Sequence, residues 1–561
     1  MRRALPDLSL AALLAALGGL VYRQALGLWL TYDDFFHLHY LYTSTPAEYL
    51  LDPEVWQRLP FKMITPLLFL SFDLDLALFG LDAHAFLVHQ LVSFALCAAA
   101  FYLVLRLWLP RAWSAFATVL FVLGPVTVSI APLLMVRHYV ETTLLCLIAV
   151  GLYVLAVRGR GMGIAIASAV LYLLAMLAKE IAVPLVFLLL LLPLPVETTL
   201  RRRLSLAVPH AAAFVLYLAY RLYMLGTMTG GYGWLVDSSD LPRLALLLPV
   251  KVGAELLGDP SAASWAMLIA LLAGLGIVLL KGRAVALLVG TSILLALLPI
   301  LPVSTEMVPR YALPAWMVLV VAFPFGIRDL LKRGGVVRLA GLGLAAIAAE
   351  GALLAHLDAR EATFARVERM SAENRAFLEM GPGDYLRTPL SPPATMGELA
   401  WLKTDLLKKR PGAGWFYDDF FVCMNPGLGR VWTWDQVERQ VEDMTASLPS
   451  LQRRHCRAIR EQAPLTVEIH AARSTLHWTL GPYREGIYSF VLGDGLQAFP
   501  MPANGGFQLR RVGGLSLRVK YRSPEGWITY SPELTMDFTR DPSFRWARPG
   551  QTDLSTRGLR R

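Results

Sequence analysis

Two adjacent carboxylates, Asp33 and Asp34, follow the first long apolar segment of the chain, in the run Tyr-Asp-Asp-Phe-Phe at 32–36. A carboxylate at the mouth of a membrane span could act as a general base on a hydroxyl group, or could hold a divalent metal beside a phosphate. The alternative is a plain helix terminus, because acidic residues commonly cap or solvate helix ends. What the pair does therefore depends on which other groups gather near it.

The same five letters recur at 417–421, but the flanking residues differ: WLTYDDFFHLHY stands against GWFYDDFFVCMN. No similarity extends beyond the pentapeptide, so the repeat carries no functional weight. The second pair, Asp418 and Asp419, is predicted to lie in a solvated turn or at a strand edge.

Further ionisable side chains stand near the ends of later apolar segments. Such groups are costly to place close to a membrane, so a functional site or mutual pairing is expected. Arginine and lysine there could hold a lipid-linked phosphate and stabilise the charge that develops as it leaves. Besides the acidic pair, the candidates are His37, His39, Arg58, Lys62, Arg137, His138, Lys179, Glu180, Glu306 and Arg310.

Asp33, Asp34, His37 and His39 resemble a metal-binding set when they are written in a line. On a helix, the two carboxylates reach His37 at spacings of four and three residues, whereas His39 points elsewhere. A hydrogen bond between an aspartate and His37 is the alternative to metal binding. His84 and His89, near the start of the second span, are predicted to form hydrogen bonds within the helical bundle.

Apolar residues make up 56% of the 561 residues and charged residues 17%, with a mean hydropathy of +0.51. This balance lies outside that of soluble domains and indicates an integral membrane protein. The basic residues form short clusters between apolar segments, so they act as topology signals and nucleic acid is not a predicted partner.

A membrane helix needs about 20 mostly apolar residues, and about eleven such spans can be placed. Two shorter apolar stretches, 66–80 and 243–256, carry charges and are predicted to lie in the membrane interface or to re-enter it. The predicted spans are 8–30, 84–109, 112–131, 139–157, 162–178, 182–198, 205–225, 262–280, 284–302, 311–327 and 337–356.

Every second connecting loop is basic, as expected of loops that stay on the cytoplasmic side. With the N-terminus inside, the loops that carry the acidic pair and the other candidates lie on the extracytoplasmic face of an inner (cytoplasmic) membrane. An odd number of spans delivers the C-terminal region to that same face. The sequence thus predicts a transmembrane domain over 1–356 and a soluble, extracytoplasmic domain over 357–561.

The soluble region is predicted to have an α+β fold. Helical patterns occur at 360–380 and 434–444, and alternating strands separated by Gly and Pro turns follow, as in a β-sandwich. Cys423 and Cys456 could pair there if the region lies outside the cytoplasm, whereas Cys97 and Cys146 are predicted to be small buried side chains in apolar segments.

The sequence contains no Gly-rich phosphate loop with Lys-Ser or Lys-Thr, no GxSxG, no HExxH and no paired CxxC. No cofactor is therefore expected, and the use of a divalent metal stays open.

Three stretches resemble motifs of the C-type glycosyltransferase superfamily, the multispan enzymes that use polyprenyl-phosphate sugars. The run YDDFFHLHY with the following FKMITPLLFLSFDLDLALFGLDAHAFLVHQ is similar to the family's first-loop region. LLAMLAKEIAVPLVFLL resembles the Lys-Glu motif of its bacterial and O-mannosyltransferase-like members, and STEMVPRYALPAW resembles their Glu…Arg-Tyr motif. The resemblance covers about residues 1–330, and the motifs occur in the family's order.

The resemblance implies a role for each matched residue. Asp33 would be the catalytic carboxylate, and Asp34 would support it by orienting the acceptor or a metal. Lys179 and Arg310, with Tyr311 in the Arg-Tyr motif, would contact the donor phosphate, and Glu180 and Glu306 would hold these cations in place. The unmatched Arg58, Lys62, Arg137 and His138 would help to bind phosphate or sugar, or they snorkel at the interface.

The sequence therefore predicts a membrane glycosyltransferase that moves a hexosyl or pentosyl group from a polyprenyl-phosphate donor, among membrane lipids, to an extracytoplasmic protein, lipid or glycan. The alternatives are a transporter or flippase of lipid-linked saccharides, and a non-catalytic member of an envelope-assembly complex. Transporters usually carry internal repeats and charges near the bilayer midplane, whereas these charges cluster at span ends.

Overall fold

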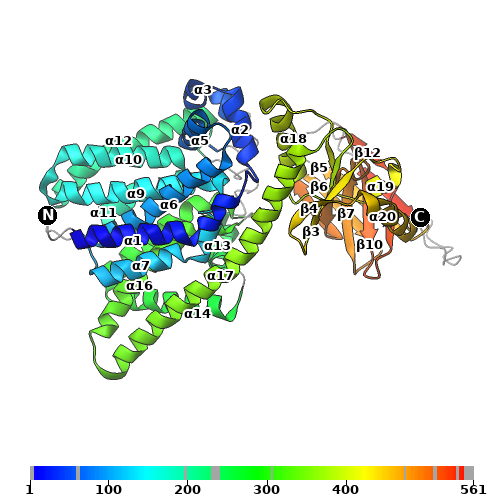
Figure 1. The fold of residues 1–561 in the computed structure, drawn as a ribbon. Helices are drawn as coiled ribbons and strands as arrows, with labels where there is room; N and C mark the ends of the chain where they lie inside the picture. The colour runs from blue at the N-terminus through cyan, green and yellow to red at the C-terminus, as the bar shows by residue number, and fades with distance from the viewer. Residues whose placement is uncertain are drawn as a thin grey trace. The chain divides into compact units, whose positions relative to one another are not determined.

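The structure, a computed structural model, describes residues 5–57, 63–194, 199–228, 241–258, 260–304, 307–472, 475–508, 514–537 and 543–548. The chain forms two compact units, Met1–Glu368 and Arg369–Arg561. Figure 1 shows the first as a helical bundle and the second as a domain rich in strands. The predicted class, a mainly helical membrane bundle with a C-terminal domain that contains strands, is confirmed.

Among the described residues, seven helices are long and apolar enough to cross a membrane, and four shorter apolar helices accompany them. Each of the eleven predicted spans overlaps one of these helices, whose backbone groups pair within the helix. The predicted spans 8–30 and 112–131 are too long, because their helices end at Val21 and Val122. The long helices are Ala83–Leu105 (α6), Leu134–Arg160 (around α9), Leu200–Leu225 (α12), Ala262–Leu279 (α14), Arg283–Leu301 (around α15), Pro309–Leu331 (around α16) and Gly335–Glu379 (α17). The shorter ones are Leu5–Val21 (α1), Arg111–Val122 (α7), Met162–Ala178 (α10) and Glu180–Leu191 (around α11).

Neighbouring helices pack along their lengths. The pairs α1 and α6, α6 and α9, and α9 and α10 are in contact and run side by side in Figure 1. α14 and α16 approach most closely at two glycines, since a Cβ atom on Gly326 would lie 2.3 Å from the carbonyl oxygen of Gly274. Small residues of this kind let the backbones of membrane helices meet.

The acidic pair lies at the start of a series of short helices that are not among these eleven apolar helices. α2 (Asp34–Thr43), α3 (Pro46–Leu51), α4 (Pro53–Gln57) and α5 (Pro66–Phe79) follow one another after the first helix. The ring of Phe69 on α5 stacks on Trp56 at 4.9 Å and meets Tyr49 edge-on at 5.7 Å, which ties these elements together. The stretches predicted as shorter helices, 66–80 and 243–256, are α5 and α13 (Leu241–Leu257).

The predicted domain boundary at 356/357 lies inside α17, which continues as one helix to Glu379. The division between the compact units falls later, between Glu368 and Arg369. Hydropathy drops at the earlier point because the helix leaves its apolar stretch, but a change in polarity does not end a helix.

The described residues of the second unit form three sheets. The first has the order β2 (Gly414–Phe416), β1 (Tyr385–Arg387), β3 (Val431–Asp435), β4 (Gln440–Asp443), with β1 parallel to both of its neighbours. The second has the order β11 (Ile528–Tyr530), β10 (Gly514–Arg522), β7 (Ile487–Leu492), β8 (Gln497–Met501), and β12 (Leu534–Asp537) also pairs with β10. The third has the order β13 (Ser543–Arg548), β5 (Leu465–Ala472), β6 (Thr475–Gly481), β9 (Asn504–Gln508).

The last two sheets share one apolar core, as the sequence predicts for a β-sandwich. Val467 and Ile469 of β5 belong to the same buried cluster as Phe490 of β7 and Val519 of β10. The alternation of apolar and polar residues along each strand turns one face of each sheet toward this core.

The helix predicted at 434–444 is wrong, because β3 and β4 form an antiparallel hairpin there, with Trp434 paired to Val441. The Asp435 side chain accepts hydrogen bonds from the N–H groups of Val437 and Glu438, which makes a turn, and Arg439 has a φ of +52°. An aspartate that bonds to the backbone just ahead of it competes with helix formation, and the helical periodicity does not include this effect.

Candidate functional site

A locked turn holds the first acidic pair. The Thr31 N–H donates to Asp34 Oδ2 at 2.8 Å, and the Asp34 N–H donates back to the Thr31 carbonyl at 3.1 Å. Between them Tyr32 has a φ of +49°, a left-handed conformation that costs energy for a bulky side chain. Such strain persists only where the surroundings impose it and is common at functional sites.

The turn places the two carboxylates in opposite environments. Asp34 is only 1% exposed, whereas Asp33 is exposed. Oδ1 of Asp34 has no hydrogen-bond partner among the residues that the structure describes. Burial, and to a smaller extent the charge of Asp33, raises the pKa of Asp34 to about 8, although the Thr31 N–H and Arg137 act in the other direction. Asp34 is therefore mostly neutral at pH 7.

Asp33 faces a cation. The protein packed around its carboxylate raises its pKa, and the positive charge of Arg310 opposes this effect. Arg310 belongs to the short turn Pro309–Ala312 that leads into α16, and its guanidinium lies 5.4 Å from the centre of the Tyr311 ring. An accessible carboxylate whose pKa is raised is a better proton acceptor than an ordinary surface aspartate.

His37 lies one turn along α2 from Asp33, and its N–H donates to the Asp33 carbonyl at 3.1 Å. Its ring meets Phe72 edge-on at 5.4 Å, and no hydrogen bond to its Nδ1 occurs within the described part of the chain. Burial and the charge of Arg137 lower the pKa of His37 to about 4, so the ring is neutral at pH 7. Within the described residues no group of three or more His, Cys, Asp or Glu side chains could hold a metal ion.

Lys179 stands between the end of α10 at Ala178 and the turn Glu180–Ala182, and it is 5% exposed. Its Nζ lies 3.3 Å from Glu180 Oε1 and 5.8 Å from the centre of the Tyr139 ring. The ion pair and the ring fix the position of the ammonium group.

His138 connects these groups, because Lys179, His37 and Arg310 all lie within electrostatic range of its ring. It is 8% exposed, and its Nδ1 has no hydrogen-bond partner among the described residues. We call Asp33, His37, His138, Lys179 and Arg310 the acid–base cluster. The fold brings its members together from four separate parts of the chain.

Arg137 lies beside this cluster, and its two terminal guanidinium nitrogens are engaged in hydrogen bonds. Its side chain is 0% exposed, and its guanidinium lies 2.6 Å from Asp75 Oδ2 and donates to the Phe86 carbonyl at 2.7 Å. His89 Nδ1 lies 2.7 Å from the other oxygen of Asp75. Arg137 thus ties α9 to α5 and α6, and the geometry gives it a positioning role.

The structure places the other predicted residues as follows. Glu180 pairs with Lys179, and Tyr311 stands beside Arg310. Arg58, Lys62 and Glu306 lie outside the described residues. His84 and His89 form the predicted hydrogen bonds within the bundle, to the Leu26 carbonyl at 3.1 Å and to Asp75.

Asp75 and Arg221 were not predicted from the sequence as site residues. Asp75 holds Arg137, and the charge of Arg221 acts on Glu180. Both are ionisable residues inside apolar helices, and this position alone could have identified them.

The second acidic pair lies in a turn directly after β2, as predicted, but the prediction that it is solvated is wrong. Asp418 is 3% exposed and accepts from the Tyr530 hydroxyl at 2.8 Å and from Lys520 Nζ at 2.6 Å. Asp419 forms two hydrogen bonds with Arg387, at 2.7 and 2.8 Å. These partners come from strands far from the pair in sequence, which a local pattern does not show.

Cys423 and Cys456 form a disulfide, with their Cα atoms 5.9 Å apart. Cys97 is free and buried, as predicted, and Cys146 is free and half-buried.

No protein-family model matches the sequence, and no curated protein matches it. Solved structures do match. The Archaeoglobus fulgidus oligosaccharyltransferase in complex with Zn and sulfate has a TM-score of 0.44 and 11% identity, over 89% of this chain and 75% of that chain. AglB from the same organism, in complex with an inhibitory peptide and a dolichol-phosphate, has a TM-score of 0.44 and 12% identity, over 90% of this chain and 76% of that chain.

ArnT from Cupriavidus metallidurans bound to undecaprenyl phosphate has a TM-score of 0.40 and 14% identity, over 78% of this chain and 98% of that chain. AglB and ArnT are both polytopic membrane glycosyltransferases of the C-type superfamily that the sequence resembles. With TM-scores below 0.5, these matches carry no argument about the residues or the activity of this chain.

Proposed function

We propose that the chain is a membrane glycosyltransferase that moves a sugar from a polyprenyl-phosphate donor to an extracytoplasmic acceptor, with Asp33 as the general base. The observation that carries the proposal is the asymmetry of the acidic pair: Asp34 is buried and locks the turn, and Asp33 is left exposed opposite Arg310. The motifs in the sequence point to the same residues.

In the proposed reaction, Asp33 takes the proton of an acceptor hydroxyl as its oxygen attacks the anomeric carbon of the sugar. The bond between that carbon and the phosphate oxygen breaks, and the polyprenyl phosphate leaves with the bonding electron pair. Arg310 and Lys179 bind this phosphate and stabilise its growing negative charge. Asp33 then returns its proton to water.

The remaining residues have supporting roles in this proposal. Asp34 holds the turn that aims Asp33, Glu180 fixes Lys179, Tyr311 packs on Arg310, and Arg137 holds the helices that carry the site. His37 and His138, as neutral rings, contact the sugar. Arg58 and Lys62 stay assigned to phosphate or sugar binding, and Glu306 to holding the phosphate-binding cations in place, on sequence grounds alone.

The proposed site faces the extracytoplasmic side of the inner membrane, as does the second unit. The alternation of basic loops supports this orientation. The disulfide between Cys423 and Cys456 supports it independently, because disulfides persist in oxidising compartments.

The test is transfer by the purified protein. It is incubated with a panel of polyprenyl-phosphate hexoses and pentoses and with protein, lipid and glycan acceptors, with and without a chelator, and products are identified by mass. The proposal expects a glycosylated product and free polyprenyl phosphate in equal amounts. Labelled donor that crosses vesicle membranes without any transfer would replace the proposal with a flippase.

A further inference from the structure

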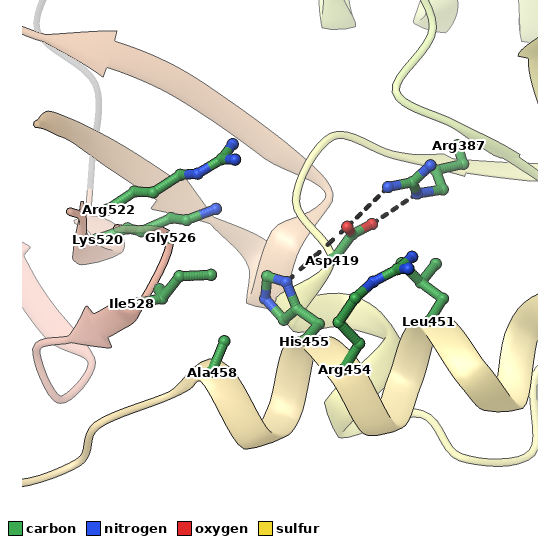
Figure 2. A pocket seen from close by; sticks show the side chains of 10 residues that line it. All are labelled: Arg387, Asp419, Leu451, Arg454, His455, Ala458, Lys520, Arg522, Gly526 and Ile528. Carbon is green, nitrogen blue, oxygen red and sulfur yellow. Dashed lines mark hydrogen bonds and ion pairs between the residues drawn. The ribbon is translucent and has the colours of Figure 1, made fainter. Parts of the chain in front are cut away.

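The second unit contains a pocket of about 280 Å³ that the acid–base cluster does not share. α20 (Leu448–Ala458) forms one wall and carries Arg454, and β10 and the end of β1 contribute the other cationic side chains. In Figure 2, Lys520 and Arg522 enter from one side and Arg387 from the other, with Arg454 and His455 rising from α20 between them. Among the described residues, four Arg and Lys side chains and one carboxylate, that of Asp419, line the pocket.

The floor of the pocket is a buried network that fixes two of the cations. Asp419 holds Arg387 through two hydrogen bonds, and Asp418 holds Lys520 at 2.6 Å. Tyr530 donates to Asp418 and lies 3.2 Å from His455 Nε2. Burial tends to raise the pKa of Asp419, but the Arg387 guanidinium outweighs it and holds that pKa below its ordinary value, so the carboxylate is charged.

Positive charge remains in excess at the rim. Arg454 and Arg522 are exposed, and within the described part of the chain neither forms an ion pair with a carboxylate. The carboxylates of Asp419 and Asp418 already form ion pairs with Arg387 and Lys520. Cations that converge on one hollow repel each other, so the arrangement is unfavourable unless an anion enters.

We propose that this pocket binds the phosphate group of a small phosphate-bearing ligand. Guanidinium groups from separate elements match the oxygens of a phosphate, and several of them favour a dianion over a single carboxylate. Leu451, Ala458 and Ile528 add apolar wall, and the volume is several times the roughly 30 Å³ that a water molecule occupies in the liquid. The pocket therefore has room for an organic part of the ligand beside its phosphate. This binding site is separate from the proposed transferase reaction and does not depend on it.

The test uses the full chain in detergent and measures binding by calorimetry. The probes are inorganic phosphate, glucose 1-phosphate and short-chain phosphatidic acid, with glucose and short-chain phosphatidylcholine as controls. We expect binding of glucose 1-phosphate, of phosphatidic acid, or of both, and no binding of the controls. Tighter binding of the sugar phosphate identifies a soluble ligand, and tighter binding of phosphatidic acid identifies a lipid headgroup.

The double variant Arg454→Gln/Arg522→Gln removes the rim cations while keeping the buried network, so the unit should fold with an unchanged melting temperature. We expect it to bind the phosphate probe at least about tenfold more weakly. The matched control is Arg453→Gln/Arg457→Gln, which removes the same charge from exposed positions on α20 that do not line the pocket. No binding of any phosphate probe by the parent protein, or an equal loss in both double variants, overturns the proposal.

Discussion

Asp33 and Asp34 are identical side chains in adjacent positions, so replacing each by asparagine is a matched pair of perturbations. Asparagine keeps the size and one acceptor oxygen of aspartate but cannot take up a proton as a base. If Asp33 is the base, Asp33→Asn loses activity while the protein keeps its fold. Asp34→Asn should retain activity, because its role is to accept the Thr31 N–H at 2.8 Å, and an amide oxygen can do this.

The structure predicts how much the activities of the two variants differ. With a pKa of about 8, Asp34 is neutral in about ten molecules for each one that is ionised at pH 7, so asparagine resembles the form already present. We expect the transfer rate of Asp34→Asn to stay within about threefold of the parent rate, since the substitution removes almost no charge from this position. A general base contributes about 10²–10⁴-fold, so Asp33→Asn should lower kcat by that factor.

The assay measures initial rates of sugar transfer from the polyprenyl-phosphate donor for the parent protein and both variants at pH 7. Donor binding is measured separately, because Asp33→Asn should leave it nearly unchanged if Arg310 and Lys179 hold the phosphate. Thermal unfolding in detergent checks that both variants are folded. An Asp33→Asn protein that is folded and transfers at the parent rate refutes the assignment, and so does an equal loss in the two variants.

Three further predictions concern stability. Arg137→Met leaves the Asp75 carboxylate buried without its cation and should lower the free energy of unfolding by about 3–5 kcal/mol. The double variant Arg137→Met/Asp75→Leu should recover most of the lost stability. Chemical denaturation of both variants measures the two free energies. Because burial raises the pKa of Asp34 to about 8, unfolding releases a proton between the ordinary aspartate pKa and pH 8, so stability falls as pH rises, by at most about 1.4 kcal/mol per pH unit. The melting temperature plotted against pH from 6 to 8 should fall less steeply for Asp34→Asn than for the parent protein. Equal slopes for the two proteins would contradict this assignment. Replacing Cys423 and Cys456 by serine opens a link between residues 33 positions apart and should cost the second unit about 3–4 kcal/mol, seen as a lower melting temperature that reducing agent does not change further.

The sequence alone determined the features that depend on neighbouring residues. Apolar runs predicted the seven long and four shorter apolar helices that the structure describes, and alternating patterns predicted β5, β6, β7, β10 and β11 of the second unit. These patterns are local, because the period of the apolar residues follows from neighbouring positions in the sequence. The same reasoning failed at 434–444, where an aspartate turn interrupts a helical period.

Only the tertiary structure decided what each charge does. The neighbouring residues do not distinguish Asp33 from Asp34. In the folded chain Asp33 is exposed opposite Arg310, whereas Asp34 is buried within the turn that it stabilises. The two YDDFF stretches are identical within the five residues, and these residues do not show that Asp418 and Asp419 bind cations from distant strands. The physical reason is that the state of a charge depends on its partners and its exposure to solvent, and packing brings those partners from remote parts of the chain.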